Sequence, residues 1–189
     1  MALRHAVLAA LLDGEYSGYE LAKVFGLGVA NFWHAVPQQL YVELAKLERE
    51  GLVAGRQVVQ ESRPNKRLFR VTDAGLTELE QFAAASAKPS FIRDDLTVKV
   101  QVVDRIDAGP VIEQLDERAV AAEAKIELLD KLLLRLRGDM EEEDFLRRGE
   151  RIGPYLTCLR GLAFERDHRD WCLRTAAVLR ERRTAHVER

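Results

Sequence analysis

The stretch PQQLYVELAKLEREGLV, residues 37–53, carries side chains that can contact the edges of DNA bases. At about 100° per residue, Leu40, Leu44 and Leu47 fall in one narrow wedge, which predicts a helix with this side in the core. The opposite side and its flanks hold Gln38, Gln39, Tyr41, Val42, Ala45, Lys46 and Arg49. Glutamine pairs with adenine edges, valine and alanine contact thymine methyl groups, and lysine and arginine bind phosphate. This composition fits a major groove, and an ordinary solvated helix surface is the alternative.

The residues after this helix predict a hairpin. Residues 52–53 and 56–60 read as one strand, and residues 66–72 read as another. The breakers ESRPN at 61–65 predict the turn between them. Two strands that follow a third helix and meet at a basic tip describe the wing of a winged helix-turn-helix.

The tip of this hairpin is expected to contact phosphate. Between Arg56 and Arg70 there are five basic residues and one acidic residue, although the whole chain has a formal net charge of −2. A local cluster, and not a global positive field, would therefore have to attract nucleic acid. We expect Arg63, Lys66 and Arg67 to bind the phosphate backbone beside the groove. A solvated hairpin is the alternative.

Further helices must position these two elements. A first helix is indicated by the spacing of Leu3, Val7, Leu8 and Leu11. Ser17 and Glu20 have the spacing of a capping box at the start of a second helix, and Pro37 suits the first position of the third. A fourth helix is expected to begin at Thr72–Asp73 and to bury Leu76, Leu79 and Phe82.

The succession SGYELAKVF, FW, QQLYVELAKLEREGLV, RPNKRLF and VTDAG resembles the PadR family of bacterial transcriptional regulators. The resemblance covers residues 1 to 85 in the same order and spacing. It implies that Tyr41 and its neighbours face DNA, and that Tyr19 and Lys23 lie near phosphate. The family usually has tyrosine where Phe69 stands, so this chain keeps the ring and loses a hydroxyl there.

The second half of the chain predicts long helices. The small residues AAASAKPS at 83–90 mark a junction, so we expect a DNA-binding domain at 1–87 and a helical dimerisation domain at 88–189. A helix is ambiguous at 92–103. From Gly109–Pro110 onward, apolar residues recur every three or four positions up to Gly138: Ile112, Leu115, Ala119, Ala122, Ile126, Leu129, Leu133 and Leu136.

A second long helix is expected from 145 to 183, with a break at Gly153–Pro154. Its apolar residues include Leu159, Leu162 and Trp171, and the stretch LRGLAFERDHRDW is similar to the closing helix of the PadR family. Two such helices without a third layer are expected to need a second copy to bury both apolar stripes, which predicts a homodimer. The dimerisation residues predicted on this basis are Ile112, Leu115, Ile126, Leu129, Leu133, Leu136, Leu159, Leu162 and Trp171.

Other classes of protein receive little support. The run MALRHAVLAALL predicts a core helix and not a signal peptide, and no segment approaches a membrane span. Cys158 and Cys172 fit a reduced cytoplasmic protein. His168 and Cys172 are four residues apart, which leaves a thiol or metal protein as one rival hypothesis. No catalytic motif, metal site or cofactor site is predicted.

Together these patterns predict a mainly α protein with an N-terminal winged helix-turn-helix. The predicted function is a cytoplasmic homodimeric transcriptional regulator that is not an enzyme, represses at an inverted repeat in double-stranded DNA, and uses no cofactor. A small-molecule effector could bind between aromatic residues; Trp33 and Trp171 are candidates, with packing anchors as the alternative. The alternative function is a winged-helix module that binds protein and not DNA.

Overall fold

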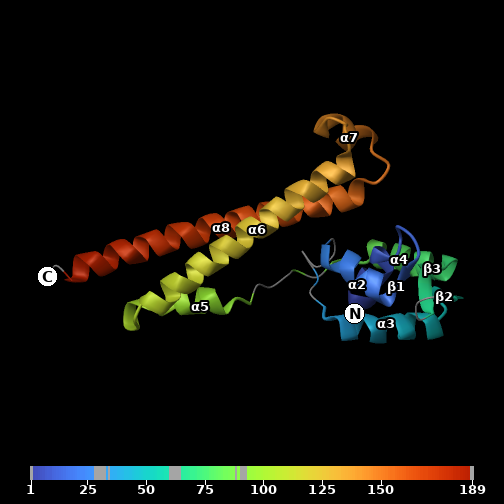
Figure 1. Cartoon of the computed structure of the whole chain (residues 1–189), viewed down its shortest axis with the longest axis horizontal. Coiled ribbons are helices and arrows are strands. Elements are labelled where there is room, and N and C mark those ends of the chain that lie inside the picture. Colours follow the sequence, from blue (N-terminus) through green and yellow to red (C-terminus); the bar gives the residue numbers. More distant parts are fainter. Residues whose placement is uncertain are drawn as a thin grey trace. The chain divides into compact units, whose positions relative to one another are not determined.

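The structure, a computed structural model, describes residues 2–27, 33, 35–59, 65–87, 89 and 93–187. It divides into two compact units, Met1–Pro89 and Ser90–Arg189, which are described separately below (Figure 1). Among the described residues, helices dominate and the strands are confined to the first unit.

The N-terminal unit is a winged helix-turn-helix, as predicted. Its elements are α1 (Ala2–Ala10), β1 (Tyr16–Ser17), α2 (Gly18–Leu27), α3 (Pro37–Arg49), β2 (Val53–Val58), β3 (Lys66–Val71) and α4 (Asp73–Ala84). The strands form an antiparallel sheet in the order β1-β3-β2. The strand β1 was not predicted, because two residues are too few to show an alternating pattern. It pairs Tyr16 with Phe69 and Ser17 with Leu68.

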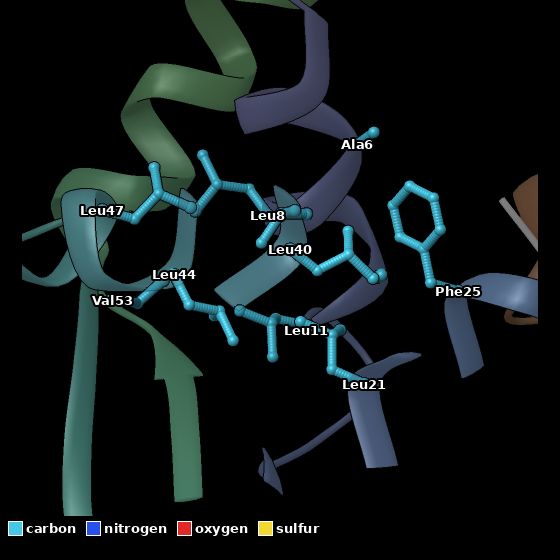
Figure 2. Close-up of a cluster of buried hydrophobic side chains, with 11 residues drawn as sticks. Ala6, Leu8, Leu11, Leu21, Phe25, Leu40, Leu44, Leu47 and Val53 are labelled. Carbon is cyan, nitrogen blue, oxygen red and sulfur yellow. The ribbon is translucent and has the colours of Figure 1, made fainter. Parts of the chain in front are cut away.

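Leucines from three helices form the core of this unit (Figure 2). Leu40, Leu44 and Leu47 of α3 are buried, which confirms the predicted inner side of that helix. They pack against a cluster that includes Leu8 of α1, Leu11 directly after it, and Leu21 and Phe25 of α2. Because the core takes one side of α3, the opposite side is left for solvent or a partner.

The helix α4 packs differently from the prediction. Leu76 and Phe82 are exposed, and only Leu79 of the predicted stripe packs against the core. The close contact is made at Gly75, where an added Cβ would clash with the Leu52 carbonyl and lie 2.8 Å from Val71 Cγ1. The helix therefore approaches the sheet through its backbone, which a search for apolar side chains cannot detect.

The C-terminal unit contains α5 (Asp95–Gln101), a 3₁₀ turn η2 (Val103–Arg105), α6 (Gly109–Arg137), α7 (Glu142–Arg148) and α8 (Ile152–Val187). The break predicted in the long helix from 145 is present, but it lies at residues 149–151, before the predicted Gly153–Pro154. Pro154 lies in the first turn of α8, where its missing N–H leaves no helical hydrogen bond unmade. Gly138 ends α6 as predicted, with a φ of 61°.

The helices α6 and α8 run antiparallel and cover one another's apolar stripes within one chain (Figure 1). Ile112, Leu115, Ile126, Leu129, Leu133 and Leu162 are buried, and Leu136, Leu159 and Trp171 are partly buried. The argument that these stripes need a second copy is therefore wrong, because each helix already supplies the other's partner. A dimer has to be argued from apolar residues that this pairing leaves exposed or partly exposed.

Candidate nucleic-acid interface

The outer face of α3 presents amide, aromatic and apolar groups to solvent. We define it by Gln38, Tyr41, Val42 and Lys46, all of which are exposed. Val42 is 68% exposed, although a β-branched apolar side chain gains nothing from facing water on a helix. The chain therefore keeps an apolar contact surface on the side of α3 that the core does not use.

Gln39 stands at the N-terminus of α3 and has a structural role of its own. Its side-chain Oε1 accepts a hydrogen bond from the backbone N–H of Val36, at 3.1 Å. This bond satisfies one of the N–H groups that a helix start leaves without a helical partner. One of the two acceptor sites of the Gln39 oxygen is thus occupied, and the amide NH₂ makes no part of this bond and can donate to a ligand.

A groove of about 910 Å³ adjoins the outer face of α3. It lies between α2, α3 and β3, and we call it the α2–α3 groove. Its lining includes five of the predicted site residues: Tyr19, Lys23, Tyr41, Lys66 and Arg67. Lys23 Nζ lies 4.5 Å from the centre of the exposed Tyr19 ring, so this cation and this ring form one surface.

Tyr41 is positioned by Gly18. A Cβ added to Gly18 would clash with the Tyr41 ring, lying 2.7 Å from Cδ1. The ring therefore rests directly on the start of α2, which only glycine allows. This contact joins two of the stretches that resemble the PadR family, SGYELAKVF with Gly18 and QQLYVELAKLEREGLV with Tyr41.

The capping box of α2 is present and supports the wing. The backbone N–H of Ser17 donates to Glu20 Oε2 at 2.9 Å, and the backbone N–H of Glu20 donates to Ser17 Oγ at 3.2 Å. The bond from the Ser17 N–H is the largest influence on Glu20 and lowers the pKa of its carboxyl below the usual range. Glu20 is therefore ionised and accepts a further hydrogen bond from Lys66 Nζ at 3.3 Å.

Three basic residues of the wing, Arg56, Lys66 and Arg67, are paired with carboxylates. Arg67 Nη2 donates to Glu48 Oε1 at 2.6 Å, and Arg56 Nε donates to Glu15 Oε2 at 2.6 Å. Sequence reasoning counted the positive charges of the hairpin but missed these carboxylates, because they belong to other elements. Arg63 lies outside the described residues.

The thiol and metal hypothesis loses its chemical support. Cys158 and Cys172 are buried, and burial raises the pKa of both thiols, which keeps them protonated and unreactive. The ring of His168 is stacked between Phe164 and Trp171, with ring centres 5.8 Å and 6.1 Å away. No group of three or more metal-binding side chains occurs among the described residues.

The two tryptophans pack against cores. Trp33 lies against the core of the first unit and Trp171 against that of the second, and both are partly buried. In the part of the chain that the structure describes, no helix has the length and apolar character needed to cross a membrane.

Two family profiles match the chain. Residues 7–81 match the transcriptional regulator PadR-like family, and residues 92–180 match the virulence activator alpha C-terminal family. Residues 7–81 therefore form a PadR-like domain. The winged helix-turn-helix with the α2–α3 groove is thus the DNA-binding fold of a transcriptional regulator of this family.

Two similar proteins align with most of the length of this chain. The probable transcriptional regulator Rv1176c of Mycobacterium tuberculosis is 28% identical and covers 97% of this chain and 100% of its own. The negative transcriptional regulator PadR of Bacillus subtilis is 26% identical, over 89% of this chain and 92% of its own.

Solved structures show the same fold. Bacillus subtilis PadR in complex with operator DNA has a TM-score of 0.74 at 24% identity, over 95% of this chain and 99% of its own. It has also been solved with p-coumaric acid, with a TM-score of 0.68 at 24% identity, over 94% of this chain and 95% of its own. The PadR-like regulator BC1756 from Bacillus cereus has a TM-score of 0.76 at 22% identity, over 95% and 96%.

Proposed function

We propose that this protein is a cytoplasmic repressor that binds an inverted repeat in double-stranded DNA as a homodimer, and that it catalyses no reaction. The observation that carries the proposal is the outer face of α3, where amide and apolar groups are exposed opposite the buried leucines. The Bacillus subtilis relative is a negative transcriptional regulator that has been solved with operator DNA, which favours the same function here.

The proposed roles follow from side-chain chemistry. Gln38, Tyr41 and Val42 contact base edges in the major groove, with the NH₂ group of Gln39 at the margin. Phosphates are bound by Lys46, by Lys23 together with the Tyr19 ring beside it, and by the wing residues Lys66 and Arg67. Arg63, which lies outside the described residues, is also proposed to bind phosphate.

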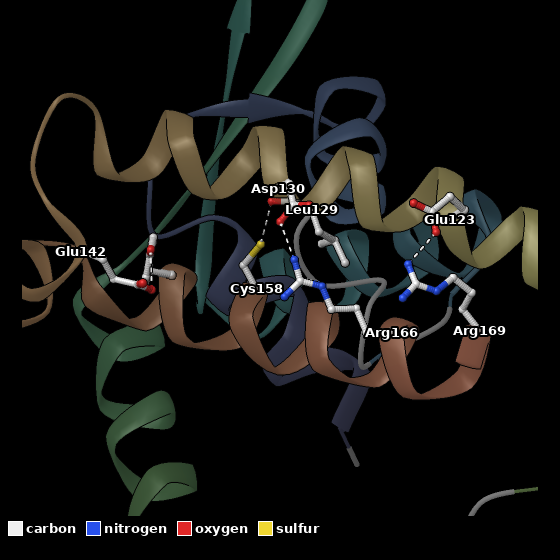
Figure 3. A network of polar contacts seen from close by, with 8 residues as sticks. Glu123, Leu129, Asp130, Glu142, Cys158, Arg166 and Arg169 are labelled. Atoms are coloured by element: carbon white, nitrogen blue, oxygen red, sulfur yellow. Dashed lines mark hydrogen bonds and ion pairs between the residues drawn. The ribbon is translucent and has the colours of Figure 1, made fainter. Parts of the chain in front are cut away.

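A second copy is proposed to cover the apolar side of the α6–α8 pair. The opposite side of the pair is charged, because three ion pairs join the two helices there: Asp116 with Arg180, Glu123 with Arg169, and Asp130 with Arg166. Figure 3 shows the latter two. These pairs are charged and already satisfied, so they offer little to an apolar partner.

Apolar residues occupy the opposite side of these helices. Phe164, Trp171 and Val178 are spaced by seven residues, so they fall within about 40° of one another on α8 and roughly opposite Arg166. Phe164 and Val178 are exposed, and Leu128 of α6, which is roughly opposite Asp130, is 45% exposed. A row repeating every seven residues on a long helix favours another long helix as its partner, which a second copy supplies.

A small-molecule effector is proposed to bind beside this row. A hollow of about 410 Å³ between α5, α6 and α8 is lined by the rings of Phe164 and His168, by three cations and by three carboxylates: Arg93, Arg118, Lys125, Asp94, Asp95 and Glu165. Lys125 is already paired with Glu165, so Arg93 and Arg118 are the cations proposed to meet the ligand. Rings and cations together suit a planar organic acid. The relative from Bacillus subtilis has been solved with such an acid. An effector there would shift the equilibrium between arrangements that bind and do not bind DNA.

The second candidate function is a winged helix that binds protein. It is favoured by the paired wing cations Lys66 and Arg67, whose carboxylate partners reduce the local positive charge. One experiment separates the two functions. The purified protein is mixed with sheared genomic DNA, the retained fragments are sequenced, and a retained fragment is titrated at two salt concentrations.

A DNA-binding repressor retains fragments that share an inverted repeat, and its affinity falls steeply with salt. A protein-binding module retains no particular fragment and shows no salt-sensitive duplex binding. The second result would overturn the proposed function.

A further inference from the structure

Glu48 of α3 forms a carboxylate bridge to both strands of the wing. Its Oε1 accepts a hydrogen bond from the backbone N–H of Gly55 on β2 at 3.1 Å and from Arg67 Nη2 on β3 at 2.6 Å. One carboxylate on the DNA-facing helix thus holds the backbone of one wing strand and the guanidinium of the other. We call these three residues the carboxylate bridge.

Gly55 leaves the space that the bridge needs. A Cβ at this position would clash with Glu48 Oε1 and lie 2.6 Å from Arg67 Nε. Any side chain on Gly55 would therefore displace the carboxylate or the guanidinium. The bridge depends on all three positions.

Arg67 is held from a second direction as well. Its guanidinium carbon lies 5.7 Å from the centre of the Phe69 ring, within the range of a cation–π contact. Phe69 is the position where the family usually has tyrosine, and the ring alone is sufficient for this contact. The guanidinium is thus fixed against α3 on one side and against β3 on the other.

This arrangement still allows Arg67 to bind phosphate. A guanidinium carries five N–H donors in a planar fork, and Nη2 is directed at Glu48, so donors remain for a phosphate oxygen. However, the bond to Glu48 and the contact with Phe69 favour one position of the guanidinium beside α3. It is presented at one place relative to α3, and the neighbouring carboxylate repels a phosphate that approaches elsewhere.

We propose that Glu48 is a positioning residue for DNA recognition. It makes phosphate binding by Arg67 depend on α3 being seated in the groove, and so increases the discrimination between operator and random-sequence DNA. This inference rests on the proposed function, because it concerns how the same surface chooses among DNA sequences.

The test is Glu48→Gln, which keeps an acceptor oxygen and removes the charge. Two duplexes of equal length are titrated over a series of salt concentrations: the fragment retained by the wild-type protein, and a random-sequence duplex. The variant should bind the random duplex about two- to fivefold more tightly, because an exposed ion pair no longer restrains Arg67. Its salt dependence on that duplex should steepen by about 0.9 in the logarithmic slope. Affinity for the retained fragment should change less, so discrimination falls.

Two controls separate the bridge from a general change of charge. Glu43→Gln removes the same charge from the opposite flank of α3, about 140° away, and should leave discrimination near the wild-type value. In an Arg67→Ala background, Glu48→Gln should change binding no more than Glu43→Gln does, since its effect passes through Arg67. Melting temperatures of all variants establish that they are folded.

Three outcomes would overturn the inference. Glu48→Gln could behave like Glu43→Gln, could weaken binding to both duplexes equally, or could keep its full effect without Arg67. Each of these requires a wild-type protein that binds DNA. A wild-type protein that binds neither duplex would instead refute the proposed function, so the two failures are distinguishable.

Discussion

At the scale of single residues, Val42 tests the outer face of α3 most sharply. It is 68% exposed and contributes almost nothing to the core, so its replacement should not unfold the protein. Val42→Asp should weaken binding to the retained fragment by about 1–3 kcal/mol, which is about 5- to 150-fold, because a carboxylate would face the base edges. Titration of the fragment, with the melting temperature as a check on folding, measures this.

The matched control is Val120→Asp on α6, where the valine is 72% exposed on a helix that is not proposed to contact bases. It should leave DNA affinity within about twofold of wild type, since exposed substitutions usually change little. If the two aspartates weaken DNA binding equally, the outer face of α3 does not read sequence.

The cysteines give a second prediction at this scale. Cys158 and Cys172 are buried and burial raises the pKa of each thiol, so neither should react with an aromatic disulfide reagent at neutral pH. Both should react once denaturant unfolds the chain. Rapid labelling of Cys172 in the folded protein, or loss of DNA binding in Cys172→Ser, would revive the thiol hypothesis.

The sequence predicted which side chains of α3 are buried or exposed better than it predicted which charged side chains form ion pairs. The buried side of α3 and its exposed amides follow from helical periodicity, which is a local property. The bonds of Arg67 to Glu48 and of Lys66 to Glu20 join residues 19 and 46 positions apart. No local pattern reports such pairs, so the sequence overestimated the free positive charge of the wing.

At the scale of elements, the junction of β1 and α2 predicts a pH dependence. The hydrogen bond from the Ser17 N–H lowers the pKa of Glu20 in the folded protein below the value of about 4.3 expected for an unfolded chain. The resulting stabilisation is therefore present above the unfolded pKa, and it is lost as the pH falls through the lower folded pKa.

Glu20→Gln should reduce the loss of stability at low pH, because glutamine has no carboxylate to protonate. Thermal melts between neutral pH and about pH 3 should show a shallower decline in melting temperature for the variant than for wild type. Glu80→Gln, an exposed carboxylate of α4, should follow the wild-type curve. Identical curves for Glu20→Gln and wild type would mean that the ionised carboxylate of Glu20 does not stabilise the folded state.

Element types were predicted well where the pattern was long, and poorly where it was short. The helices α3 and α6 begin and end close to the predicted prolines and glycines. The strand β1 has two residues, and its pairing with β3 depends on chain segments about fifty residues apart. The break between α7 and α8 was expected at Pro154, but proline is compatible with a first helical turn.

At the scale of the whole molecule, the proposed dimer depends on which side of the α6–α8 pair is apolar. Leu128→Asp should weaken self-association by at least about tenfold, because Leu128 lies on the side with Phe164 and Trp171. Leu134→Asp is the matched control, since Leu134 is 57% exposed on the same helix but lies near the side of the ion pairs. Sedimentation velocity over a range of concentrations distinguishes the two variants. Equal effects would remove this side as the dimer interface.

The central claim is that two copies of this chain hold two α3 helices against one DNA duplex. It is tested most directly by sedimentation of the wild-type protein with the fragment it retains, at low and at moderate salt. The account predicts two chains for each duplex at low salt and a large loss of affinity at the higher salt. Single chains that leave the duplex unbound at low ionic strength would contradict it.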